Sequence, residues 1–152
     1  MVIINVDALF VDTNILIYAT DPRSPFQQAA FDRLEAARRQ GVDLIISPQI
    51  LREYLAAATR AASRGGATSL TDALSNFRTF RAAFTVLADS PAVLDVLDSL
   101  VGGIAVAGKQ VHDANIVATM VTYGIRSLLT HNTGDFARFA HLITIVSLVP
   151  VP

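Results

Sequence analysis

Short apolar runs alternate along the chain with longer segments whose apolar residues recur every three or four positions. The run at 8–11 contains no polar residue, which is typical of a strand buried in a parallel sheet. Further runs at 43–47, 84–88, 125–130 and 142–146 predict additional strands. We expect a sheet of four or five strands, with the first strand near its middle.

Helix starts are marked three times by a serine followed directly by a proline, because serine caps a helix and proline fits its first position. Strands that alternate with helices predict an α/β domain, in which helices cover both faces of a mostly parallel sheet. The length of 152 residues fits a single domain over 1–152. The predicted helices cover residues 13–20, 25–40, 48–63, 70–81, 91–100 and 111–123, with a short helical turn at 136–139.

Composition narrows the class of protein. Hydrophobic residues make up 52% of the chain and charged residues 16%, which favours a folded globular protein over a disordered one. No apolar run is long enough to span a membrane, and residues 1–7 lack the basic region and cleavage site of a signal peptide. The chain has no cysteine, which excludes disulfide scaffolds, thiolate zinc sites and cysteine catalysis. We therefore expect a cytoplasmic protein.

Two aspartates follow predicted strands. Asp12 comes directly after the first strand, at the edge where open α/β sheets bind ligands, but a cap of the next helix explains it equally well. Asp135 follows the strand at 125–130 through a polar loop, and alone it is best explained as a cap of the turn at 136–139. If the two strands are parallel, however, both carboxylates lie at the same edge of the sheet.

Two further acids lie on predicted helices. Asp113 shares a face with Ile116, Val117 and Met120, and a carboxylate on an apolar face is costly unless it is paired, protonated or bound to a metal. A later helix start would instead make Asp113 a cap. Glu53 lies at the edge of an apolar arc, where a solvated boundary residue is the commoner explanation.

Together the four acids would form a cluster with oxygen ligands alone. Crowded like charges repel one another, so such a cluster implies a bound cation. Carboxylate oxygens, without cysteine or a histidine pair at ligand spacing, favour Mg²⁺ or Mn²⁺ over zinc. A divalent ion in this setting suits phosphate chemistry, because it polarises a phosphoryl oxygen and lowers the pKa of a bound water.

The acids and their neighbours resemble the PIN domain family of metal-dependent ribonucleases, in the family's order and over nearly the whole chain. In size and layout the chain is similar to the VapC-type toxins of bacterial toxin–antitoxin pairs. The resemblance implies a three-layer α/β/α sandwich and hydrolysis of RNA by a metal-activated water. The matching segments are Phe10-Val11-Asp12-Thr13-Asn14, Arg52-Glu53, His112-Asp113-Ala114 and Thr130-His131-Asn132-Thr133-Gly134-Asp135-Phe136.

The resemblance also implies roles for individual residues. Asp12, Glu53, Asp113 and Asp135 would be the catalytic, metal-binding set. Asn14 would orient the site through hydrogen bonds, and Thr13, Thr130 and Asn132 would line it. An acidic residue often stands in the family where this chain has Asn132, so occupancy by a single ion is plausible.

RNA, a cognate antitoxin and a second copy of the chain are the partners that the resemblance implies. Because the net charge is only −1, RNA binding needs a local basic patch. One alternative is a PIN-like module that binds RNA or protein without cutting. Another, an aspartyl phosphatase, is disfavoured because position 14 is Asn. The candidate RNA contacts are Arg52, Arg60, Arg64, Arg78, Arg81, Lys109, His112 and His131, and the two histidines could also act as a general acid.

Overall fold

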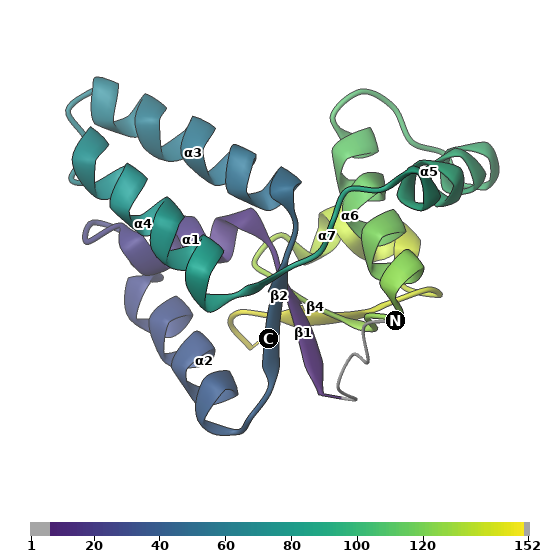
Figure 1. Ribbon diagram of the computed structural model, residues 1–152, viewed down its shortest axis with the longest axis horizontal. Coiled ribbons are helices and arrows are strands. Elements are labelled where there is room, and N and C mark those ends of the chain that lie inside the picture. Colours follow the sequence, from purple (N-terminus) through teal and green to yellow (C-terminus); the bar gives the residue numbers. More distant parts are fainter. Residues whose placement is uncertain (1–6, 151–152) are drawn as a thin grey trace.

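Five parallel strands form the centre of the protein in the computed structural model, which describes residues 7–150 (Figure 1). Their order is β3-β2-β1-β4-β5, and every neighbouring pair is parallel. The predicted strand number and the central place of the first strand are confirmed. The strands are β1 (Ala8–Val11), β2 (Asp43–Ile46), β3 (Thr85–Val86), β4 (Ser127–Thr130) and β5 (Thr144–Ser147).

Helices lie on both sides of this sheet, α1 to α4 on one and α5 to α7 on the other (Figure 1). The predicted three-layer α/β/α sandwich is confirmed. The expectation about a signal peptide concerns residues 1–7, and all of these except Asp7 lie outside the described residues. The helices are α1 (Thr13–Thr20), α2 (Gln27–Arg39), α3 (Pro48–Ser63), α4 (Leu70–Ala83), α5 (Pro91–Gly103), α6 (Gln110–Tyr123) and α7 (Thr133–Phe136), followed by the 3₁₀ turn η1 (Ala137–Phe139).

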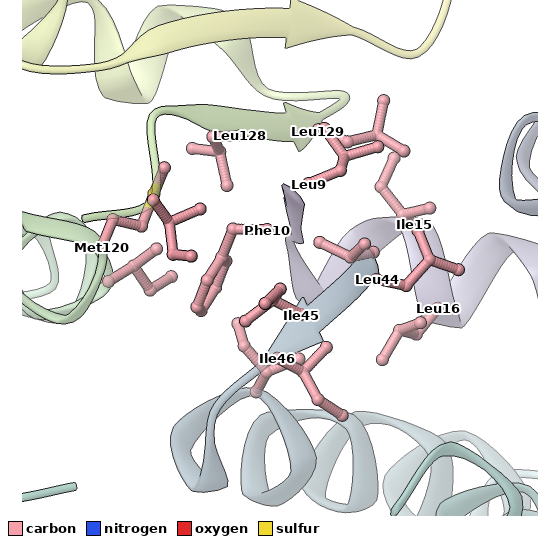
Figure 2. Packing of buried hydrophobic residues seen from close by; sticks show 14 of the residues in the cluster. Leu9, Phe10, Ile15, Leu16, Leu44, Ile45, Ile46, Met120, Leu128 and Leu129 are labelled. Atoms are coloured by element: carbon pink, nitrogen blue, oxygen red, sulfur yellow. The ribbon is translucent and has the colours of Figure 1, made fainter. Parts of the chain in front are cut away.

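The core is built on the middle strands, whose side chains are buried on both faces. Phe10 of β1 pairs in register with Ile45 of β2 and Leu128 of β4, and all three are fully buried. Figure 2 shows Phe10 and Leu128 directed toward Met120 of α6. Parallel pairing in this register places β1 and β4 next to each other. The carboxyl ends of β1 and β4 are therefore held side by side.

Several boundaries of helices and strands differ from the predictions by one to three residues. α2 begins at Gln27 because Ser24 accepts a hydrogen bond from the backbone of Phe26 and closes a turn before the helix. α5 continues through Gly103, and β3 is only two residues long. The end of α6 matches the prediction, since Gly124 adopts the left-handed conformation, with φ 73°, that favours glycine.

The apolar spacing in the helix predicted at 91–100 places five side chains inside, namely Val93, Leu94, Val96, Leu97 and Leu100. This prediction is wrong in part, because Val93 is buried whereas Leu94 is 61% exposed. The physical reason is that α5 packs mainly on α6, at the periphery of the molecule, so one narrow stripe of the helix is covered. No helix within residues 7–150 is long and apolar enough to cross a membrane.

Candidate active site

Asp12 lies at the carboxyl end of β1 and is 7% exposed. Its Oδ1 accepts a hydrogen bond of 2.7 Å from the backbone N–H of Thr13, so Asp12 caps α1. The cap and the position at the binding edge of the sheet, which the sequence left as alternatives, therefore occur together. Capping occupies one carboxylate oxygen and leaves the other for the neighbouring strand.

The second oxygen of Asp12 is bound by side chains from two elements. The Thr130 hydroxyl at the end of β4 donates to Asp12 Oδ2 at 2.7 Å, and the Asn14 amide donates to the same oxygen at 3.2 Å. Asn14 also accepts from the backbone N–H of His131 at 3.1 Å, and the N–H of Asn132 donates to Thr130 Oγ1. Asn14 thus holds the loop after β4 beside Asp12. The side chain of Asn132 itself is exposed.

Glu53 enters the site from the second turn of α3. Its Oε2 accepts from the Thr13 hydroxyl at 2.7 Å, and its Oε1 accepts from the Gln49 amide at 2.8 Å. Both carboxylate oxygens are therefore oriented by neutral donors. Sequence reasoning missed Gln49, although its position four residues before Glu53 places the two side chains on one helix face. Glu53 is half-buried, as its place at the edge of the apolar arc predicts.

Asp113 and Asp135 are not helix caps, so those alternatives are wrong. The N-cap of α6 is Lys109, which places Asp113 in the first turn. The N-cap of α7 is Asn132, and Asp135 lies inside the helix. Among the residues that the structure describes, neither carboxylate receives a hydrogen bond or an ion pair. Both carboxylates remain available to a ligand.

The charges of the four acids act on one another. Burial raises the pKa of Asp12 from 3.8 to about 6, despite the hydrogen bonds from Thr130 and Thr13, and the charges of Glu53 and Asp135 add to the rise. The pKa of Asp113 is also raised to about 6. Burial is the largest cause, and the charges of Asp135, Asp12 and Glu53 add to the rise. The acids thus repel one another, although they come from four different elements.

The donor type of this cluster fits a hard divalent cation, since every side chain offers carboxylate oxygen. The charges of neighbouring acids also contribute, after burial, to the raised pKa values of Asp12 and Asp113. Over residues 7–150, however, no three His, Asp or Glu side chains lie close enough to ligate one ion together. Direct binding by three acids would therefore require these side chains to move closer together.

Arg138, which sequence reasoning also missed, is a positive charge that acts on Asp113. Its Nη1 donates to the carbonyl of Ala105 and to Oε1 of Gln110, each at 2.8 Å. Arg138 partly offsets the rise in the pKa of Asp113. No sequence motif marks this arginine, because the contact depends on how η1 packs beside the start of α6.

The predicted RNA-contacting residues lie in different places. Arg52 and Arg81 line an open groove of about 540 Å³ with Phe77 and Phe84, and Arg52 also lies 4.0 Å from Asp89. Arg64 lies at the far end of α3, about 16 Å along the helix axis from Glu53 at 1.5 Å per residue. The side chains of Arg60, Arg78, Lys109 and His112 are exposed.

His131 lies among aromatic rings and differs from the other candidates in this respect. Its ring centroid is 4.3 Å from that of Phe26 and 5.3 Å from that of Tyr18. The Nδ1 atom is buried and has no hydrogen-bond partner within the described chain. Packing of this kind is typical of a structural residue, and contact with RNA stays a prediction for this side chain.

Comparisons with known proteins agree with this architecture. A toxin–antitoxin complex from Klebsiella pneumoniae is 24% identical, with a TM-score of 0.67 over 95% of this chain and 99% of that one. VapBC2 from Rickettsia felis, bound to a promoter DNA fragment, is 16% identical, with a TM-score of 0.66 over 92% and 98%. VapC20 from Mycobacterium tuberculosis, a sarcin-ricin loop cleaving toxin, is 16% identical, with a TM-score of 0.62 over 79% and 86%.

These structures share the fold of this chain. A search of curated proteins finds no significant match. The family model of the PIN domain matches residues 9–142, which include all four acids. The chain therefore belongs to the PIN domain family.

Proposed function

We propose that the protein is a divalent-metal-dependent endoribonuclease. One observation carries the proposal: Asp12 at the end of β1 and three acids on α3, α6 and α7 raise one another's pKa values or share in doing so, and two of the four have no partner within the described residues. Membership of the PIN domain family supports it. Mutual repulsion among the acids and the burial of Asp12 are costly to the fold, and a cation would relieve that cost.

Asp12, Glu53, Asp113 and Asp135 would hold the ion, which would be Mg²⁺ or Mn²⁺. When bound, such an ion polarises a phosphoryl oxygen and lowers the pKa of water. The protein's own contribution is orientation. Thr130 and Asn14 fix the Asp12 carboxylate, and Thr13 fixes Glu53, while Asp113 and Asp135 stay free to adjust.

We further propose that the protein is the toxin of a toxin–antitoxin pair and that its cognate antitoxin covers the acidic site. Structural neighbours from Klebsiella pneumoniae and Rickettsia felis are such complexes, which supports this proposal. A homodimer is part of the same proposal. The exposed Leu94 and Val101 of α5 supply apolar surface for it.

Cleavage of a mixed cellular RNA pool tests the nuclease, with Mg²⁺, with Mn²⁺ and with EDTA. Discrete fragments should appear only with metal, and Asp113→Asn should remove them while far-UV circular dichroism stays unchanged. Asp98→Asn is the matched control, because this exposed aspartate of α5 lies outside the site. If Asp113→Asn cuts RNA at the parental rate, the metal site is wrong, and equal cleavage by every variant indicates a contaminant.

A second candidate is a PIN module that binds RNA or protein without cutting. The spacing of the acids favours it, since no three described side chains are close enough to ligate one ion as they stand. RNA binding in a gel-shift assay, without cleavage under any metal, would support this candidate. Metal-dependent cleavage would exclude it.

A further inference from the structure

Gln49 lies in the first turn of α3 and is 7% exposed. Its side-chain nitrogen donates to Glu53 Oε1 at 2.8 Å and to the backbone carbonyl of His112 at 2.9 Å. Its side-chain oxygen accepts from the Asn115 amide at 2.7 Å. Both donors of this amide and its acceptor are therefore used, which is a specific arrangement for a buried polar group.

These hydrogen bonds join two helices that otherwise pack on different parts of the molecule. α3 packs on α4 and α1, whereas α6 packs mainly on α5 (Figure 1). Within residues 7–150, Gln49 makes every side-chain hydrogen bond between α3 and α6. Those two helices carry Glu53 and Asp113. The hydrogen bonds of Gln49 therefore form a bridge between the helix of one acid and the helix of the other.

We propose that Gln49 is a positioning residue that holds Glu53 at a fixed place relative to Asp113 and thereby sets the affinity of the site for a divalent cation. The inference rests on the metal site of the proposed function. A neutral amide suits the task, because it can donate to a carboxylate and to a carbonyl while it accepts from Asn115. A glutamate would lack both donors and add a negative charge.

Mn²⁺ binding, followed by electron paramagnetic resonance of the free ion at pH 7.5, tests the proposal without any need for RNA. Gln49→Met keeps the length of the side chain but removes every hydrogen bond. We expect its dissociation constant to rise about 10- to 100-fold, the range typical of residues that support metal ligands. Gln28→Met is the matched control, because Gln28 also donates to an acid four residues later, Asp32, on the exposed face of α2.

Asn115→Ala provides a second, milder variant. It removes one hydrogen bond of the bridge, so a rise in the dissociation constant smaller than that of Gln49→Met is expected. Because both residues act through one link, the double variant should bind Mn²⁺ no more weakly than Gln49→Met alone. Should Gln49→Met fail to fold, an unchanged dissociation constant for Asn115→Ala overturns the proposal.

The outcomes separate this inference from the proposed function. If Gln49→Met binds Mn²⁺ within twofold of the wild type, the positioning role is wrong, whether or not RNA is cut. If the variant binds weakly but the wild type cuts no RNA, the nuclease is wrong and the positioning role stands. Absence of Mn²⁺ binding by the wild type refutes both.

Discussion

In the metal-free protein, the effect of Asp12→Asn on the free energy of unfolding should be more favourable at neutral pH than at acidic pH. This holds although Asp12 belongs to the predicted catalytic set. Burial and neighbouring charges raise the pKa of Asp12 from 3.8 to about 6. The ionised side chain then costs about 3 kcal/mol of folding free energy, at 1.36 kcal/mol for each pH unit. Asparagine carries no charge and does not incur this cost.

The pH window follows from the direction of the shift. The folded protein binds the Asp12 proton more tightly than the unfolded chain does, so stability is highest below the unfolded pKa of 3.8. It falls as the pH rises toward 6, and the full cost is present above that value. Between pH 4.5 and pH 7.5 the linkage relation gives a loss of about 2 kcal/mol from this group.

Asparagine keeps the oxygen that caps α1, but its amide nitrogen replaces Oδ2, which accepts hydrogen bonds from Thr130 and Asn14. Loss of these two hydrogen bonds costs about 1–3 kcal/mol at every pH. The test therefore uses the change with pH in the difference between the unfolding free energies of the variant and the wild type. This change cancels the constant cost.

Urea denaturation in EDTA, followed by far-UV circular dichroism at both pH values, measures the two free energies of unfolding. The free energy of unfolding of the variant minus that of the wild type should increase by about 2 kcal/mol from the lower to the higher pH. A difference that stays constant with pH would refute the claim that Asp12 is a strained, buried carboxylate. A large loss of stability at both pH values would mark Asp12 as a structural cap alone.

Saturating Mg²⁺ should raise the melting temperature at pH 7.5, because an ion at about 100 times its dissociation constant adds about 2.7 kcal/mol, and Asp113→Asn should lose most of this gain in a thermal melt. Thr130→Val removes the hydroxyl that donates to Asp12 Oδ2, so NMR titration should find the pKa of Asp12 raised further, and urea denaturation should find a loss of about 1–2 kcal/mol. Gly124→Ala forces a side chain into a left-handed conformation, with φ 73°, and should cost about 1 kcal/mol in urea denaturation while RNA cleavage stays at the wild-type rate.

The sheet could be predicted from the sequence because each strand overlaps a short apolar run, although the bounds of β3, β4 and β5 differ from the predicted ones. Asp12 and Thr130 then follow, since parallel strands present their carboxyl ends at one edge. The α5 face could not be predicted in full. Leu94 has the periodicity of a buried residue, but periodicity does not reveal how wide a partner covers the helix.

Asp113 was found because a charge lies on an apolar face, and Asp12 and Asp135 because they follow predicted strands. The side chains that support the acids have no comparable signal in the sequence. Gln49 and Arg138 are ordinary polar residues at unremarkable positions in the sequence. The contacts of Gln49 depend on the approach of α3 to α6, and those of Arg138 depend on the packing of η1 beside Gln110. Such approaches depend on tertiary packing, which local sequence patterns do not encode.

The hydrogen bond between Thr130 and Asp12 joins residues separated by 118 positions in the chain. During synthesis, Asp12 emerges early, but its partner at the end of β4 is made only when most of the chain exists. At about 5–20 residues per second, several seconds separate the two events. A chain that has not yet reached Thr130 therefore lacks the donor that orients Asp12, and the order of translation delays assembly of the acidic site until β4 has been made.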